Sequence, residues 1–246
     1  MPTIFLSPST QEYNQYVTGA GSEEYFMNLL ADAMEPLLLS NGIQFTRNDP
    51  RGTVSDSIRQ SNAGRYDFHL ALHSNASGPG SEGRSRGIVA FYYPGSAGGQ
   101  RGAELIAKNL REIYPLPDKV TTRPTTALGE VSRSRFPAVL VEIGYHDNYS
   151  DALWLESHVE DVARQLVKAL TEYFGLPFIP HMDPKRGTVR LSYGTLNLRS
   201  TPSPAGTVIA NLPNGAEVTV YGEWNGWYVV QYGDQVGYAA AAYIDV

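Results

Sequence analysis

Hydrophobic residues in the first part of the chain fall into two alternating patterns. Apolar runs of strand length occur at Thr3 to Leu6, Ile43 to Thr46 and Phe68 to Leu72. Between them, residues 26–37 carry apolar side chains at helical spacing, and a second helix is predicted over 54–62. Strands that alternate with helices indicate a mainly parallel, twisted sheet flanked by helices, so we predict an α/β fold.

The alternation continues as far as residue 174. A strand is predicted at Gly87 to Tyr93, a helix at Gln100 to Ile113 and a buried strand at Ala138 to Val141. A last helix begins at the capping-box pattern of Ser157 and runs to Phe174. The segment from Tyr114 to Arg135 contains three prolines and is expected to be irregular.

The pattern changes near residue 188. Residues 188–246 show no helical periodicity, and short strands alternate with turns rich in Gly, Pro and Asn. About sixty residues suffice for a small closed β-barrel that hides its edges. Residues 177–187 contain prolines and read as a semi-rigid linker, which includes His181. We therefore expect an α/β domain over 1–176 and an all-β domain over 188–246.

Charge and composition limit the function. The chain has 19 basic and 25 acidic residues, a net charge of −6, and no basic run, so a nucleic-acid partner and an anionic membrane are not expected. No apolar span of membrane length occurs, so membrane insertion is not expected either. The first residues lack the charged and apolar regions of a signal peptide. Nothing in the sequence indicates an oligomeric state.

The absence of cysteine restricts the metal chemistry. With no thiolate available, a metal ion must be held by His, carboxylate or amide groups. His73 and Glu142 each follow a predicted buried strand, and the carboxyl ends of such strands bind ligands in open α/β sheets. His73 is therefore a candidate zinc ligand and Glu142 a candidate acid/base. The alternatives are a His satisfied by the backbone and a Glu at a solvated strand end. His69 lies on the same strand face and is expected to be a core residue.

Two polar segments have less definite roles. The loop from Ser74 to Arg86 follows His73 and is either a rim over the site or a plain exposed loop. Arg123, Arg133 and Arg135 are either contacts for an acidic substrate or solvated charges.

Three stretches of the C-terminal region identify its type. They are LNLRSTPS, VIANLPNGAEVTV and NGWYVVQYGDQVGY. Together they resemble a bacterial SH3-type domain, a module that usually recognises cell-wall peptidoglycan. This resemblance covers residues 188–246 and implies peptidoglycan as a partner.

The first 176 residues resemble the zinc-dependent N-acetylmuramoyl-L-alanine amidases of the amidase_3 type. The matching residues are Glu24 ahead of Asn28, His73 before Asn75, and Glu142 before Gly144. The resemblance implies zinc as the cofactor, Glu24 and His73 as metal ligands, and Glu142 as the catalytic carboxylate.

One motif departs from the family. Where the family has an Asp-Pro-Gly-His turn, this chain has Ser-Pro-Ser-Thr-Gln at 7–11, so the usual first His ligand is missing. A catalytic zinc site needs about three protein ligands. Gln11 and His146 are the candidates for the third, and His146 has the alternative role of a hydrogen-bonded turn residue.

The resemblance implies a hydrolase that acts at the bacterial cell wall, outside the cell, as an autolysin or an endolysin. It would cleave the amide bond between N-acetylmuramic acid and the L-alanine of the stem peptide, with Glu142 as base toward a zinc-activated water. Two alternatives stay open. One is an inactive relative that only binds peptidoglycan, and the other is a metallo-hydrolase of the same fold that cuts another bond of the wall peptide.

Overall fold

The computed structural model describes residues 1–246 and contains two compact units. One comprises residues 3–34 and 45–173, and the other comprises residues 1–2, 35–44 and 174–246. The domain boundaries predicted at 176 and 188 stay predictions, and each unit is described by itself.

A six-stranded sheet forms the centre of the first unit. Its strands are β1 (Thr3–Pro8), β2 (Gln44–Arg47), β3 (Phe68–Asn75), β4 (Ile88–Tyr92), β5 (Val120–Pro124) and β6 (Ala138–Tyr145), in the order β2-β1-β3-β6-β4-β5. β3 runs parallel to both β1 and β6, whereas β4 is antiparallel to β6 and parallel to β5. The predicted α/β class is therefore confirmed, with one reversal of direction between β6 and β4.

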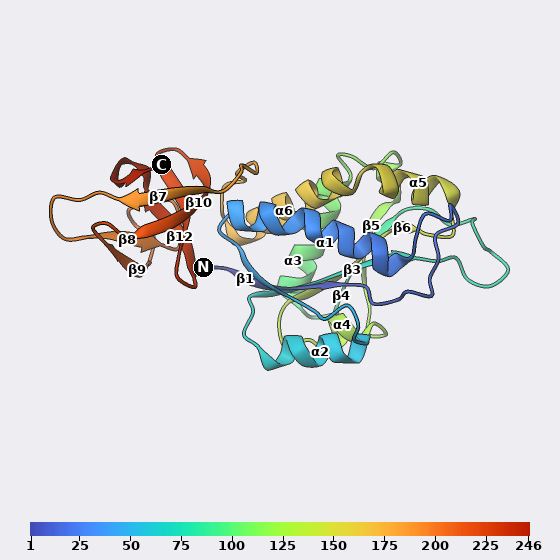
Figure 1. Ribbon diagram of the computed structural model, residues 1–246. Helices are drawn as coiled ribbons and strands as arrows, with labels where there is room; N and C mark the ends of the chain where they lie inside the picture. The colour runs from blue at the N-terminus through green and yellow to red at the C-terminus, as the bar shows by residue number, and fades with distance from the viewer. The chain divides into compact units, whose positions relative to one another are not determined.

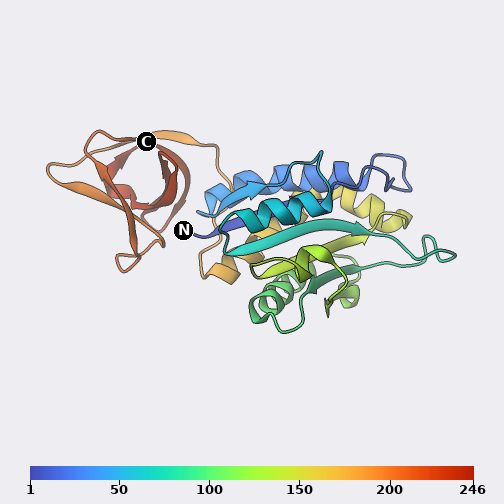
Figure 2. The ribbon, with the colours of Figure 1, turned by 90° about the horizontal axis from the view of Figure 1, so that it is seen from below.

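Helices cover both faces of this sheet. They are α1 (Glu23–Ser40), α2 (Val54–Ala63), α3 (Ala97–Leu110), α4 (Gly129–Ser132), α5 (Tyr149–Ser157) and α6 (Val159–Phe174), with a 3₁₀ turn η1 at Pro117–Lys119. Figure 1 shows α1, α5 and α6 above the sheet and α2 and α4 below it. Seen from below, α2 lies in front of the strands (Figure 2). None of the helices is both long and apolar enough to span a membrane.

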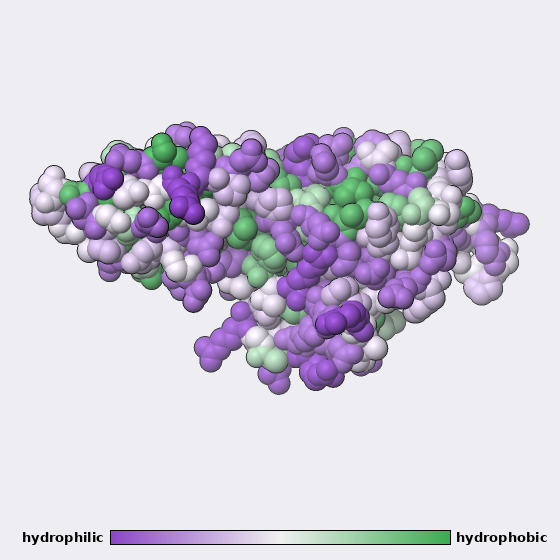
Figure 3. Space-filling model, viewed as in Figure 1, coloured by the Kyte–Doolittle hydropathy of each residue, from purple (hydrophilic) through white to green (hydrophobic).

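The face of each helix follows from the alternation of side chains along the strands. Phe68 points to the upper face, where its ring lies 4.8 Å from that of Tyr173 in α6. Ala71 and Leu140 point to the lower face and pack with Val131 of α4. On the outer surface drawn in Figure 3, hydrophilic residues predominate and hydrophobic ones form smaller groups.

The expectation of an irregular segment over 114–135 was wrong. It contains η1, the edge strand β5 and the single turn of α4. β5 pairs only with β4, is partly exposed and ends in Pro124, so it lacks the apolar run by which buried strands are recognised. A four-residue helix is also too short to show a periodic pattern.

The two strands that carry the candidate residues are longer than their apolar runs. β3 continues through His73 to Asn75 and β6 continues through Glu142 to Tyr145. His73 is directly paired with Glu142, but the next pair is Asn75 with Tyr145, so β6 contains one extra residue. Gly144 lies in this bulge with φ +75°, a conformation that favours glycine.

The second unit contains the predicted all-β region. Its strands are β7 (Lys185–Val189), β8 (Thr195–Arg199), β9 (Val208–Pro213), β10 (Glu217–Trp224), β11 (Trp227–Tyr232), β12 (Gln235–Ala240) and β13 (Ile244–Asp245), with a 3₁₀ turn η2 at Ala241–Tyr243. They form one antiparallel sheet in the order β13-β7-β10-β11-β12-β8-β9, which curves around a central core (Figure 2). Alternate residues such as Val218 and Val220 fill that core.

Candidate active site

His73 lies at the centre of a buried cluster of polar side chains. Its Nδ1 donates to Glu23 Oε1 at 2.8 Å, and its Nε2 donates to Glu130 Oε2 at 2.9 Å. Glu23 and Glu130 are only 1% and 2% exposed. Burial opposes the charged ring, but the two carboxylates outweigh it and hold the pKa of His73 well above its ordinary value.

Glu23 reaches this cluster from the first turn of α1, where the helix dipole favours a carboxylate. It also accepts a hydrogen bond of 2.6 Å from Asn14 Nδ2. Burial raises the pKa of Glu23, but the bonds from His73 and Asn14 outweigh burial and leave the pKa below its ordinary value. Glu23 is thus held as an anion beside His73.

Gln11 adds a third side chain from the loop after β1. Its Nε2 lies 3.3 Å from His73 Nδ1 and 3.4 Å from Glu23 Oε1, and its Oε1 accepts from the Tyr13 hydroxyl at 2.9 Å. An amide, a carboxylate and an imidazole from three separate segments therefore meet at His73 Nδ1.

Glu130 closes the other side of the cluster from α4. Its Oε1 accepts from Ser7 Oγ at 2.5 Å and from His69 Nε2 at 3.2 Å. Burial raises the pKa of Glu130, but the bonds from His69 and His73 lower it by more, so the group is an anion. His69 is buried, as expected for a core residue, and it also forms part of this polar network.

Glu142 lies beside His73 on the same face of the sheet, because the two are register partners on neighbouring parallel strands. Its Oε2 is buried and has no hydrogen-bond partner. Burial, aided by the negative charges of Glu23 and Glu130 and opposed by His73, raises its pKa to about 7. A carboxyl group with a free oxygen and a pKa near neutrality suits the transfer of a proton.

The structure places the other two predicted ligands outside this cluster or at its edge. Glu24 accepts a 2.9 Å hydrogen bond from Asn28, one turn along α1. His146 Nδ1 donates to the carbonyl oxygen of Ser74 at 3.0 Å and lies 4.0 Å from Glu23 Oε2. Gln11 and His73 are brought together, whereas the metal-binding roles of Glu24 and His146 stay predictions.

Sequence reasoning did not single out Glu23 or Glu130. Glu23 is adjacent to Glu24, and only the rotation of α1 about its axis decides which carboxylate faces His73. Glu130 lies in the segment that was expected to be irregular. One feature of the sequence could have indicated Glu130, because it is a single acidic residue between the apolar residues Leu128 and Val131. Such a pattern indicates a buried charge with a partner.

The long loop after β3 is attached to the turn after β6. The backbone N–H groups of Ser77 and Gly83 both donate to Asp147 Oδ2 at 3.0 Å. The loop is thus held at the carboxyl end of β6, on the same edge of the sheet as Glu142.

Two of the arginines considered as substrate contacts differ in position and partners. Arg123 lies in β5, and Arg135 donates to the carbonyl oxygen of Asn62 at 3.3 Å.

The side chains as they lie do not complete a site for a divalent metal ion. His, Asp and Glu side chains alone form no group of three or more that could hold one. The cluster at His73 Nδ1 reaches three donors only with Gln11, whose amide must turn over to present its oxygen. In its present orientation this amide directs its nitrogen toward His73, and its oxygen accepts from the Tyr13 hydroxyl and from Asn14 Nδ2. The unpartnered oxygen of Glu142 is free to take up a proton.

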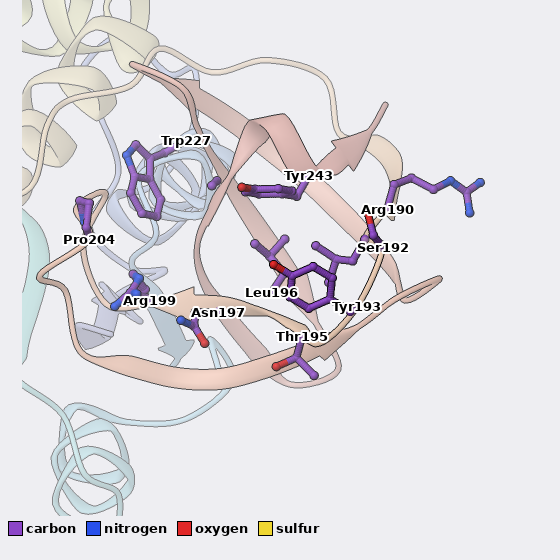
Figure 4. Close-up of a pocket in the computed structure, with 12 residues that line it drawn as sticks. Arg190, Ser192, Tyr193, Thr195, Leu196, Asn197, Arg199, Pro204, Trp227 and Tyr243 are labelled. Atoms are coloured by element: carbon purple, nitrogen blue, oxygen red, sulfur yellow. The ribbon is translucent and has the colours of Figure 1, made fainter.

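A cavity of about 600 Å³ lies in the all-β unit. Its lining includes Tyr193 and Tyr243, which are 90% and 49% exposed. Figure 4 shows the two tyrosine rings on either side of Leu196, with Trp227 and Arg199 at the opposite end. We call this cavity the aromatic groove.

Solved structures share the fold of the first unit. An N-acetylmuramoyl-L-alanine amidase AmiC2 of Nostoc punctiforme superimposes with a TM-score of 0.62 at 14% identity, over 71% of this chain and 97% of that chain. An N-acetylmuramoyl-L-alanine amidase from Clostridium difficile 630 gives a TM-score of 0.62 at 18% identity, with the same shares of the two chains.

Sequence comparisons give relatives with the same description as these structures. The N-acetylmuramoyl-L-alanine amidase LytC of Bacillus subtilis (strain 168) is 27% identical over 170 residues, which are 67% of this chain and 34% of that protein. The chain thus spans about a third of that relative's length. Residues 194–245 match the bacterial SH3 domain, and residues 10–172 match the N-acetylmuramoyl-L-alanine amidase family Amidase_3. By this match to more than half of its length, the chain belongs to the N-acetylmuramoyl-L-alanine amidase family.

Proposed function

We propose that this protein hydrolyses peptidoglycan at the amide bond between N-acetylmuramic acid and the L-alanine of the stem peptide. The observation that carries this proposal is Glu142, a half-buried residue with one buried, unpartnered carboxyl oxygen and a pKa raised to about 7, beside the polar groups gathered at His73. The family of the chain and its bacterial SH3 domain support peptidoglycan as the substrate.

Glu142 is the residue that moves the proton. In its anionic form it accepts a proton from the attacking water, and in its neutral form it passes that proton to the departing amine of L-alanine. A pKa near 7 makes both forms accessible at neutral pH. Zinc, when bound, would polarise the scissile carbonyl and lower the pKa of the attacking water.

We infer that Glu23 and His73 would hold the zinc ion, with Gln11 as the third ligand once its amide has turned over. Gln11 is favoured over His146 because Gln11 Nε2 lies 3.3 Å from His73 Nδ1, the place that the amide oxygen would take after the turn, whereas His146 Nδ1 is bonded to the carbonyl of Ser74. Glu23 is favoured over Glu24 because only Glu23 bonds to His73.

The proposal is tested by digesting purified peptidoglycan with and without a chelator and identifying the products by mass spectrometry. We expect stem peptides with a free L-alanine amine, glycan strands with intact muramic acid, and no release after chelation. Fragments cut within the stem peptide would favour a metallo-hydrolase of another bond. No release by a protein that still sediments with the wall would favour an inactive binding protein.

The two adjacent glutamates provide a matched pair of variants for the ligand assignment. Glu23→Gln should abolish stem-peptide release and stoichiometric zinc, while Glu24→Gln should retain both, because only the first removes a carboxylate from His73. Zinc content is measured by mass spectrometry of the metal. The reverse pattern would assign the ligand to Glu24 instead.

We further propose that the bacterial SH3 domain attaches the protein to peptidoglycan through the aromatic groove. Its exposed tyrosines, its tryptophan and Arg199 offer stacking and hydrogen-bonding surfaces for a peptide or a sugar. Attachment raises the effective concentration of the amidase domain at the polymer, so the site of action would be the bacterial cell wall.

A further inference from the structure

We propose that Arg123 of β5 is a specificity-determining residue that binds a carboxylate of the stem peptide, on the residue that follows L-alanine. This inference rests on the proposed function, because it names a group of the substrate that the same site recognises. The residues that carry it are Thr121, Arg123 and Tyr145, which lie on the side of Glu142 that faces away from His73.

Arg123 lies on the same face of the sheet as Glu142. β4 joins the two strands, since Phe91 is the register partner of both Arg123 in β5 and Leu140 in β6. Leu140 and Glu142 are two residues apart in β6, so their side chains point to one face. The face that carries Glu142 therefore continues across β4 to Thr121 and Arg123 at the edge of the sheet.

The register also gives the separation of the two side chains. Glu142 and Arg123 are two strand spacings and two residues apart, so their Cα atoms are roughly 12 Å from each other. An extended peptide advances about 3.4 Å per residue, so the second residue after a cut beside Glu142 lies roughly 7 Å along this line. The Arg123 side chain covers the remaining distance.

The two sides of Glu142 differ in exposure. On one side, His73 and Glu130 are only 5% and 2% exposed. On the side of β5, Thr121 is half-buried and Arg123 is exposed. A peptide chain that reaches Glu142 without displacing buried side chains therefore comes over β4 and β5.

A β-bulge adds Tyr145 to the same open side. β6 contains one extra residue between Glu142 and Tyr145, so Tyr145 becomes the register partner of Asn75 and returns to the face of Glu142. Burial raises the pKa of Tyr145, the charge of Arg123 opposes that rise, and the charge of Glu142 adds to it. The phenol thus lies near both charges, and it can donate a hydrogen bond to an anion held by Arg123.

Arg123 is the positive group of this open side. Its guanidinium forms no ion pair or hydrogen bond within the protein, whereas that of Arg135 is used by the carbonyl oxygen of Asn62. The carboxylates of Glu142 and Glu23 repel an anionic substrate. An unpaired guanidinium at the rim offsets that repulsion and offers two parallel N–H donors, which fit a carboxylate.

The test uses two soluble glycan-strand substrates whose stem peptides differ in one group. In one, the residue after L-alanine carries a free carboxylate, and in the other the same group is an amide. We expect the wild type to prefer the carboxylate form. Arg123→Gln should raise the KM for that form about 10-fold, the effect of losing a hydrogen bond to a charged group, with kcat unchanged. Its KM for the amide form should stay within twofold of the wild type.

Two further variants separate this role from a general effect of charge. Arg65→Gln removes an exposed arginine near the amino end of β3, the strand whose carboxyl end carries His73, and should change neither KM. Arg123→Lys keeps the charge but not the paired donors, so its KM for the carboxylate form should lie between those of the wild type and Arg123→Gln.

The outcomes distinguish this role from the proposed function. An equal loss on both substrates, or no change on either, overturns the carboxylate-binding role of Arg123 and leaves the amidase activity intact. A wild type that releases no stem peptide from either substrate overturns the proposed function, and the role of Arg123 with it.

Discussion

At the scale of single residues, the main feature is Glu142, a half-buried residue with one carboxyl oxygen that is buried without a partner. Glu142 is placed by β6 beside two other carboxylates and one imidazole, and its raised pKa of about 7 is the result. Burial of an unpartnered polar atom reduces the stability of the fold, and here the same environment suits the carboxyl group to proton transfer.

This cost predicts how the stability of the metal-free protein depends on pH. Below pH 4.5, Glu142 is protonated in both the folded and unfolded states and contributes nothing. Between pH 4.5 and about 7 only the unfolded chain loses the proton, so the free energy of unfolding falls as pH rises, and above that range the cost is constant. Glu142→Gln should therefore be more stable than the wild type at pH 8, by up to roughly 3 kcal/mol, and equal to it at pH 4.

Chemical denaturation in the presence of a chelator measures the effect. Glu112→Gln, a change in a surface ion pair with Lys168, is the control and should show no such pH-dependent gain. Equal curves for Glu142→Gln and the wild type at both pH values would contradict the prediction.

The sequence indicates His73 and Glu142 because each follows a long apolar run, and parallel strands bring such positions together. It could not choose between Glu23 and Glu24, because the choice depends on how α1 is rotated against the sheet. Glu130 depends on tertiary contacts with His69 and Ser7 that no local pattern contains.

At the scale of elements, the close packing of α3 on the sheet depends on glycine. A Cβ atom on Gly102 would lie 2.6 Å from the ring of Phe68 and 3.3 Å from Val139. Both neighbours are fully buried in the sheet, so the helix or the strands would have to move.

Gly102→Ala should therefore destabilise the protein by about 1 to 3 kcal/mol, although alanine is the better helix former. Gln100→Ala, at an exposed position of the same helix, should have little effect. Thermal unfolding followed by circular dichroism measures both variants. A stabilised Gly102→Ala would show that α3 can shift without loss of packing.

The direction of β4 is the feature of this sheet that the sequence does not predict. The apolar run of residues 87–93 indicates a strand but not its orientation. The polar loop between β3 and β4, residues 76–87, is long enough to return the chain in either direction, and pairing with β6 decides the antiparallel arrangement.

At the scale of the whole molecule, the proposed function divides attachment and chemistry between two regions of the chain. The bacterial SH3 domain carries the aromatic groove, and the amidase region carries Glu142. This division predicts that binding to the wall and cleavage of soluble fragments can be changed separately.

Combined replacement of Tyr193 and Tyr243 by Ala should weaken co-sedimentation with purified peptidoglycan by about 10-fold, from the loss of two aromatic contacts. Release of stem peptides from short soluble fragments should be unchanged. Tyr149→Ala, an exposed tyrosine of α5, is the control for aromatic area alone. Unchanged sedimentation of the double variant would exclude the aromatic groove as the attachment site.

The position of Glu142 within its strand has a consequence for how heat inactivates the protein. Its strand pairs with β3 on one side and β4 on the other, so this residue is in the middle of the sheet and not on a loop. Backbone amides in such strands are among the last to exchange with deuterium, because they open only when the domain unfolds as a whole. Heat should therefore inactivate the protein in a single step with the melting of its sheet, without an earlier stage in which the fold survives and Glu142 is displaced.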